Sequence, residues 1–96
     1  MLRINPRAFI RHEPNYHGNN VFIFVGDTSE AYEANEDVYE ILQMIKRKIP
    51  NSELLKELKA KYDASEEDEI ERLLNATIHE LLLQGVIEEI EDNNIL

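Results

Sequence analysis

In the first third of the chain the apolar residues are aromatic or β-branched, and turn residues divide them into short runs. Residues 7–12 alternate loosely between apolar and polar, which is typical of a strand with one buried face. Val21–Val25 places five β-forming residues in a row between turn residues and is the strongest strand signal in the chain. The turn residues 26–29 allow a hairpin, so we predict a short third strand at Glu30–Ala34.

From residue 35 onward the apolar residues follow the helical period. Asn35 is a favourable N-cap for a first helix, and Pro50 ends that helix. Asn51 or Ser52 is expected to cap the second helix. The apolar stripes of these two helices are Val38, Ile41, Leu42 and Ile45, followed by Leu54, Leu55, Leu58 and Tyr62.

A third and longer helix follows the first two. Ser65 and Asp68 resemble a capping box at its start. The helix runs to about Gln84, and Gly85 supplies its C-terminal stop. Residues 86–90 add a final extended segment.

The order of three antiparallel strands and then three helices predicts an α+β fold. Two short helices before a longer third one are typical of a helix-turn-helix, and strands packed beside it make a winged variant. The pattern shows no internal repeat, no linker and no second domain. We therefore expect residues 1–96 to form a single domain with a core at about residues 5–90.

The chain has 96 residues, with 20 Asp and Glu against 10 Lys and Arg, which gives a formal net charge of -10. This acidity weighs against a general nucleic-acid-binding protein, because such proteins need a surplus of cations. It also weighs against charge-driven docking on anionic membranes. We find no apolar run typical of a signal peptide and none of the roughly 20 residues that a membrane span needs. We expect a cytoplasmic protein.

No residue pattern in the sequence indicates catalysis. Cysteine is absent, which excludes disulfides, thiol nucleophiles and Cys-ligated metals. His12, His17 and His79 lack metal-ligand spacing. The acids of residues 66–71 are typical of a solvated helix start, and the three isolated glycines form no phosphate-binding loop. We expect no enzyme activity, no cofactor and no metal.

The third helix carries more apolar surface than one packing contact needs. At about 100° per residue its apolar residues cover an arc of roughly 180°, against about 100° for a helix packed once on a core. These residues are Ile70, Leu73, Leu74, Thr77, Ile78, Leu81 and Leu82. Either the helix lies between two parts of the core, or one flank of the arc lines a groove beside a strand edge. In the second case an extended peptide adds to the strand and places alternate side chains in the groove.

Three stretches of the chain are similar to a known family. Residues 32–45 resemble the third strand of that family and the following helix, which contains an Ile-Leu pair. Residues 52–58, together with Tyr62, resemble its second helix. Residues 69–87 resemble its third helix and the Gly-containing segment that ends it. Together they resemble the PqqD family of small peptide chaperones. The fold of this family is also called the RiPP recognition element, after ribosomally synthesised and post-translationally modified peptides. The family usually has a Gly before its second helix, where residues 48–51 are Lys-Ile-Pro-Asn here.

The resemblance implies a non-catalytic protein that holds the leader region of a precursor peptide as an added strand. Such a protein presents the rest of the peptide to a separate modifying enzyme, often a radical SAM enzyme. The peptide-binding residues implied are Glu30, Ala31, Tyr32, Glu33 and Ala34 of the strand, with Ile70, Leu73, Leu74, Thr77, Ile78 and Leu81 of the third helix.

A winged-helix regulator that binds DNA is the alternative function. Residues 46–62 contain six Lys or Arg and two Glu, a local charge of +4, whereas residues 63–96 contain eleven acids and one Arg. A recognition helix needs basic and hydrogen-bonding residues, and the third helix offers few of them among many acids. The acids instead predict a peptide partner that is apolar at alternate positions and has Lys or Arg nearby.

Overall fold

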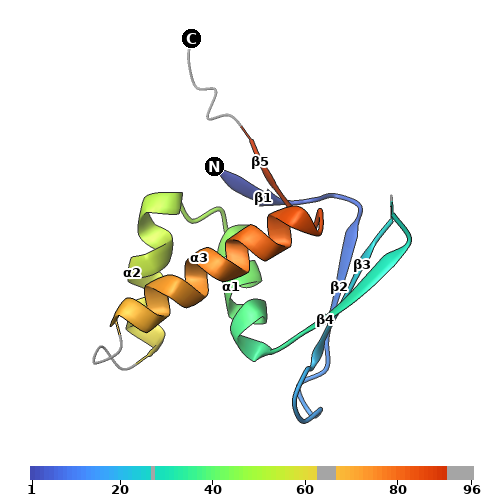
Figure 1. The fold of residues 1–96 in the computed structure, drawn as a ribbon, viewed down its shortest axis with the longest axis horizontal. Coiled ribbons are helices and arrows are strands. Elements are labelled where there is room, and N and C mark those ends of the chain that lie inside the picture. The colour runs from blue at the N-terminus through green and yellow to red at the C-terminus, as the bar shows by residue number, and fades with distance from the viewer. Residues whose placement is uncertain (27, 63–66, 91–96) are drawn as a thin grey trace.

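The computed structural model describes residues 1–26, 28–62 and 67–90 (Figure 1). Its elements, in chain order, are β1 (Leu2–Ile4), β2 (Ala8–His12), β3 (Val21–Val25), β4 (Glu30–Ala34), α1 (Glu36–Lys46), α2 (Asn51–Lys61), α3 (Glu67–Leu83) and β5 (Ile87–Glu89). None of the helices in this part of the chain is long and apolar enough to cross a membrane. The predicted α+β order of strands followed by three helices is confirmed.

The strands β2, β3 and β4 form an antiparallel sheet in that order. Val21, Ile23 and Val25 are almost fully buried, whereas Phe24 is 49% exposed. This alternation places one face of the sheet on the core and the other in solvent, because successive side chains of a strand point to opposite faces. The strands predicted at Val21–Val25 and Glu30–Ala34 are confirmed with those bounds.

The first residues form a strand that the sequence analysis did not predict. The strand β1 pairs with β5 in an antiparallel two-stranded sheet, in which Arg3 lies opposite Glu88. The Arg3 Nε and Glu88 Oε2 atoms are 2.7 Å apart, and Leu2 is only 5% exposed. The hydrophobic core therefore begins at residue 2. The final extended segment predicted at residues 86–90 is confirmed as β5, with the bounds Ile87–Glu89.

The helices α1 and α2 begin in different ways. The side-chain oxygen of Asn35 accepts a hydrogen bond from the backbone N–H of Val38 at 3.2 Å, which confirms the predicted N-cap. The prediction that Asn51 or Ser52 caps α2 is wrong: Pro50 occupies the N-cap position, and no side chain caps this helix. A proline fits there because its ring fixes φ near the helical value, and its missing N–H is one that a helix start leaves unbonded.

The helix α3 ends at the predicted glycine. Gly85 has a φ of +77°, its N–H donates to the carbonyl of Leu82, and the N–H of Val86 donates to the carbonyl of Leu81 at 3.0 Å. These two bonds form a Schellman motif, in which glycine is favoured because it tolerates positive φ. Ser65, which is predicted to cap the start of α3, lies outside the described residues.

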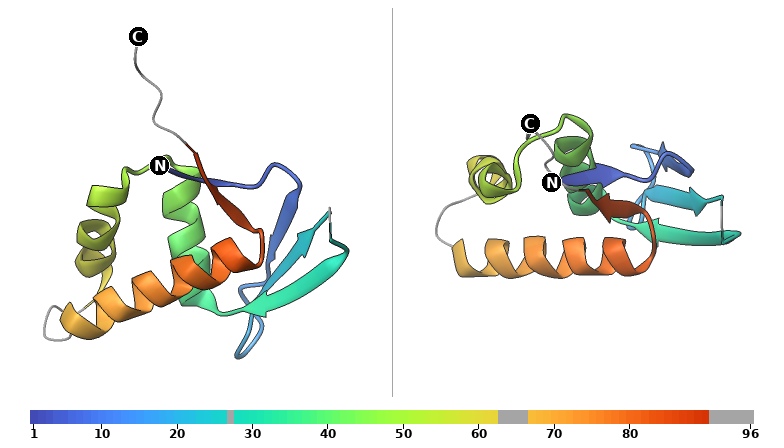
Figure 2. Two further views of the ribbon diagram at one scale, coloured as in Figure 1. Left: turned by 45° about the horizontal axis from the view of Figure 1, so that its top comes forward. Right: turned by 90° about the horizontal axis from the view of Figure 1, so that it is seen from above.

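The core lies between the inner face of the β2–β3–β4 sheet and the three helices. Helix α1 contributes almost fully buried residues to this core, namely Ile41, Leu42, Met44 and Ile45. In the right-hand view of Figure 2, α3 and β4 lie in one layer, and α1 and α2 lie in a second layer above it. This arrangement leaves β4 and α3 beside each other at the surface.

Candidate functional site

A groove of about 460 Å³ lies between β4 and α3. One wall comes from the end of β4 and the start of α1, and the opposite wall comes from the second half of α3. The lining residues are Asn19, Ile23, Tyr32, Glu33, Ala34, Asn35, Val38, Ala76, Thr77, Glu80, Leu81 and Gln84. Most of these side chains are apolar or uncharged, which suits a groove that binds an extended segment of chain.

The β4 strand is an edge of its sheet. It pairs with β3 alone among the described residues, so every second residue of β4 turns its backbone N–H and C=O groups away from the sheet. Tyr32 and Ala34 lie half-buried against the core. Glu33, between them, is exposed and lies opposite Phe22 on the outer face. The edge therefore offers backbone hydrogen bonds beside the apolar groove.

The wide apolar arc of α3 serves two purposes. Ile70, Leu74 and Leu81 are 6%, 4% and 3% exposed and belong to the core, and Ile78 packs against that core. Thr77, on one flank of the arc, lines the groove, and so does the edge of Leu81. Both possibilities for this helix therefore hold in part, since the arc covers the core on one side and reaches the groove on the other.

The structure brings together some of the eleven residues predicted to bind a peptide, and separates others. The groove lining includes Tyr32, Glu33, Ala34, Thr77 and Leu81. The remaining predicted residues lie outside the lining: Glu30 and Ala31 at the start of β4, and Ile70, Leu73, Leu74 and Ile78 along α3. Their contact with a peptide stays a prediction.

Several lining residues were not predicted from the sequence. On α3 they are Ala76, Glu80 and Gln84, which border the apolar arc next to Thr77 and Leu81. Glu80 lies four residues from Ala76 and four residues from Gln84, a spacing that puts all three on one face of the helix. This spacing would predict Ala76, Glu80 and Gln84 as lining residues if the side of α3 that faces the groove were known. Which side faces the groove depends on where β4 lies.

The charges in the groove are all negative. Glu33 and Glu80 are its two charged lining residues, and neither forms an ion pair within the described part of the chain. Within the described residues the Glu80 carboxylate accepts one long hydrogen bond, 3.4 Å, from the side-chain amide of Gln84. Both carboxylates are thus available to a cationic partner, that of Glu80 from the groove side and that of Glu33 from the outer face of the β4 edge.

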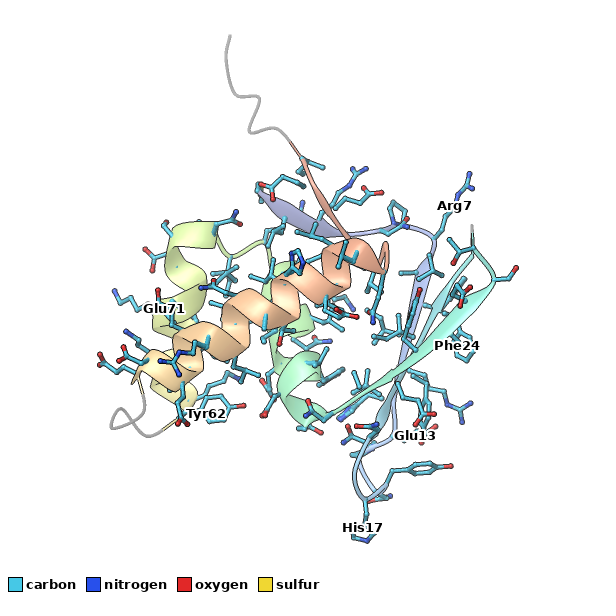
Figure 3. All side chains as sticks on the ribbon, viewed as in Figure 1. Arg7, Glu13, His17, Phe24, Tyr62 and Glu71 are labelled. Atoms are coloured by element: carbon cyan, nitrogen blue, oxygen red, sulfur yellow. The ribbon has the colours of Figure 1, made fainter. Side chains whose placement is uncertain are left out.

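Among the described residues no cluster of His, Asp and Glu could hold a metal. His12 has a structural role: its Nε2 lies 2.8 Å from the Glu36 carboxylate, and its ring stacks on Tyr39 with centroids 3.8 Å apart. Hydrogen bonds from His12 and from Asn20 hold the pKa of Glu36 below its usual value. His17 lies at the tip of the β2–β3 connection and points away from the body of the molecule (Figure 3).

Comparison with known proteins yields two similar solved structures. No family model and no curated protein sequence matches the chain. The first structure is described as lasso peptide synthetase B1 complexed with the leader peptide. It is 17% identical with a TM-score of 0.73, and the match covers 92% of this chain and 98% of that one. The second is TbiB1 in complex with the TbiA(beta) leader peptide, 16% identical with a TM-score of 0.76, covering 94% and 99%. This chain therefore has the fold of these two proteins, in agreement with the fold that the resemblance to the PqqD family implies.

Proposed function

We propose that this protein is a non-catalytic chaperone that binds the leader region of a precursor peptide and presents the rest of that peptide to a separate modifying enzyme. The observation that carries the proposal is the open edge of β4 beside the apolar groove on α3. The leader adds to β4 as a further strand, and its alternate side chains enter the groove.

The chemistry of the groove supports this mode of binding. Main-chain bonds to β4 are independent of the peptide sequence, so they supply affinity without selecting a partner. Contacts with Tyr32, Val38 and Leu81 bury apolar side chains of the peptide, at about 25 cal/mol for each Å² removed from water. We therefore assign affinity to main-chain bonds at the strand edge and selectivity to side-chain contacts, among them those in the groove.

The two similar structures support the choice of ligand, because both are complexes with a leader peptide. The first is described as a lasso peptide synthetase, the second as TbiB1, and neither description contains a radical SAM enzyme. A modifying enzyme as partner is part of our proposal. The finer expectation of a radical SAM enzyme rests on the resemblance to the PqqD family alone.

The proposal treats residues 1–96 as one peptide-recognition domain in the cytoplasm. Its core extends the predicted span of residues 5–90 toward the N-terminus, because Leu2 is buried. No step of the proposed function needs a cofactor, since binding and presentation involve no change of covalent bonds.

The DNA-binding alternative finds little support in α3, the helix that would enter the major groove. Its exposed residues include Glu69, Glu71 and Glu80 against the single cation Arg72. Carboxylates on a recognition helix oppose the phosphates on both sides of the groove. The basic segment of residues 46–62 lies on the end of α1 and on α2 instead.

An NMR titration tests the proposed function. The protein, labelled at amides and methyl groups, is mixed with a synthetic leader of a precursor peptide encoded beside its gene. We expect chemical-shift changes at the amides of Glu30–Ala34 and at the methyls of Thr77 and Leu81. Shifts confined to other surfaces, or no shifts with any such leader, contradict the proposal.

A matched pair of variants locates the binding site. Thr77→Arg places a long side chain in the groove, and we expect it to weaken leader binding at least about tenfold, since it blocks the apolar lining. Glu71→Arg changes an exposed residue nearer the start of the same helix, far from β4 (Figure 3), and should change binding less than about twofold. Equal effects of the two variants would place the peptide elsewhere.

A further inference from the structure

The outer face of the sheet ends in two short rows of side chains at the open edge. Strand register places Phe9 opposite Phe24, and Phe24 opposite Ala31. In the next outward-facing row, Arg11 lies opposite Phe22, and Phe22 lies opposite Glu33. The last residue of each row, Ala31 or Glu33, belongs to the edge strand β4.

All three phenylalanines of the chain lie on this outer face. Phe9 is 70% exposed and Phe24 is 49% exposed, while Tyr16 packs edge-on against Phe22 with ring centroids 5.6 Å apart. Large aromatic side chains exposed together usually mark a contact surface. Ala31, the β4 residue opposite Phe24, carries only a methyl group, so it leaves room beside the Phe24 ring on the side where a further strand would add.

Glu33 ends the other row with an uncompensated charge. Other glutamates of the chain form ion pairs: Glu13 with Arg11, Glu40 with Lys61 and Glu88 with Arg3. Within the described residues Glu33 has no such cation. A carboxylate at a strand edge favours a cation directly opposite on the neighbouring strand.

We propose that the bound peptide is selected by these two rows through a pair of residues two positions apart. This inference rests on the proposed function, because it needs the peptide to pair with β4. The peptide residue opposite Glu33 is Lys or Arg, and the residue opposite Ala31 is aromatic or large and aliphatic and contacts Phe24 over Ala31. The spacing of two holds whether the peptide runs parallel or antiparallel to β4, because side chains alternate in both cases.

The geometry of a sheet supports both contacts. Opposite residues on adjacent strands have their Cβ atoms about 5 Å apart, which suits an ion pair between Glu33 and a peptide cation. Phe24 lies two strand spacings, about 9.6 Å, from the peptide backbone, a gap that two large side chains bridge when the residue between them is alanine. On the groove side, Glu80 adds a second negative charge, so no charged lining residue repels the cation.

Selection from a display library of random 12-residue peptides tests the inference. On the wild-type protein we expect enriched peptides to carry Lys or Arg with an aromatic or large aliphatic residue two positions away. Selection on Glu33→Lys should replace the cation with Asp or Glu at the same place. Selection on Glu71→Lys, which changes the net charge equally at an exposed site far from β4, should keep the wild-type pattern.

The size of each contribution is measured by comparing the affinity of one peptide, selected on the wild-type protein, for the wild type and for the variants. We expect Glu33→Lys to weaken its binding by about three- to tenfold at low salt, and the loss should shrink as salt screens the charges. The aromatic contact has its own pair of variants. Phe24→Thr should remove the preference opposite Ala31, whereas Phe9→Thr, one strand further from the edge, should leave it unchanged.

The outcomes separate this inference from the proposed function. Peptides that enrich and shift the β4 amides but lack the cation, or that keep it on Glu33→Lys, overturn the inference and leave the proposed function standing. Failure to enrich any peptide that binds at β4 overturns both.

Discussion

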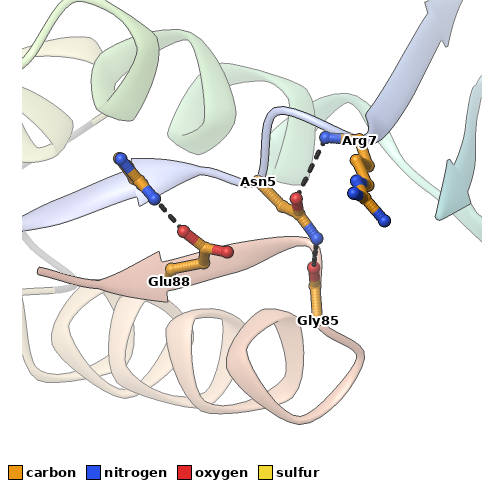
Figure 4. A network of polar contacts seen from close by, with 5 residues as sticks. Asn5, Arg7, Gly85 and Glu88 are labelled. Atoms are coloured by element: carbon orange, nitrogen blue, oxygen red, sulfur yellow. Dashed lines mark hydrogen bonds and ion pairs between the residues drawn. The ribbon is translucent and has the colours of Figure 1, made fainter. Parts of the chain in front are cut away.

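The side-chain amide of Asn5 donates a hydrogen bond to the backbone carbonyl of Gly85, 2.9 Å away, across 80 positions of the sequence (Figure 4). The Asn5 side-chain oxygen accepts from the N–H of Arg7 at 3.0 Å, and the Asn5 backbone N–H donates to the carbonyl of Val86. One asparagine thus joins the segment between β1 and β2 to the end of α3. It holds the helix beside the sheet and thereby sets the position of one wall of the groove.

Replacing Asn5 with alanine should destabilise the protein. The variant loses both side-chain hydrogen bonds and leaves the half-buried Gly85 carbonyl without that donor, at a cost of about 1–2 kcal/mol. Urea denaturation measures the loss. Asn15→Ala, in the exposed turn between β2 and β3, is the control and should change stability by less than about 0.5 kcal/mol. Equal effects would show that the Asn5 bonds do not stabilise the fold.

Lys48 occupies a position that favours glycine. Its φ is +62°, its N–H donates to the carbonyl of Ile45, and the N–H of Ile49 donates to the carbonyl of Met44. The end of α1 is therefore a Schellman motif with lysine in the left-handed conformation, at the segment where the PqqD family usually has glycine. We expect Lys48→Gly to raise the free energy of unfolding by about 0.5–1 kcal/mol, because glycine adopts this φ without strain.

The control for this prediction is the same substitution two residues earlier. Lys46 is the last residue of α1, where glycine has the lower helix propensity, so Lys46→Gly should lower the free energy of unfolding by about 0.5–1 kcal/mol. Opposite signs in urea denaturation support the left-handed conformation of Lys48. Destabilisation by both substitutions contradicts it.

Ile23 and Phe24 are neighbours on β3 with opposite environments. Ile23 is 1% exposed, and Phe24 is 49% exposed. Ile23→Ala should therefore cost about 2–5 kcal/mol through lost burial and a cavity. Phe24→Ala should cost about 1 kcal/mol or less, mainly as a lost cross-strand pair with Phe9, which lies opposite it in the strand register. Thermal or urea unfolding distinguishes these values. A larger loss at Phe24 would mean that the two faces of the sheet are exchanged.

Tyr62 titrates at unusually high pH. Burial, together with the hydrogen bond that its hydroxyl donates to the Asp37 carboxylate, raises the pKa of Tyr62 from 10.0 to about 12. Because the folded pKa lies above the unfolded one, the stabilisation is complete below pH 10 and is lost as the pH rises through 12. Tyr62→Phe should lower the free energy of unfolding by about 1–2 kcal/mol near neutral pH. The difference from wild type should shrink between pH 10 and 12.

Absorbance of tyrosinate checks the assignment of this titration. The absorbance of the wild-type protein should show a tyrosine titration step near pH 12, and this step should be absent in Tyr62→Phe. Tyr16→Phe, which changes an exposed tyrosine, should retain it. If the step survives in Tyr62→Phe, the hydrogen bond to Asp37 is not its cause.

Local signals in the sequence correctly predicted most of the elements. Val21–Val25 is a strand because five β-forming residues leave no helical period, and Asn35 and Gly85 mark helix ends through bonds to residues within five positions. The cap of α2 was predicted wrongly. Ser52 is a favourable capping residue, but Pro50 begins the helix two residues earlier. Competition between nearby start signals depends on packing as well as propensity.

The sequence by itself determined that this chain forms strands followed by helices and that α3 has an apolar arc too wide for one contact. Those properties follow from residue spacing, which reports the phase of a helix or strand. Spacing does not report which partner each face meets. The pairing of β1 with β5 and the bond from Asn5 to Gly85 join residues at least 80 positions apart, so only the tertiary structure decided them. It likewise decided that the Thr77 and Leu81 flank meets β4 to form the groove, because that depends on where the sheet lies against the helix.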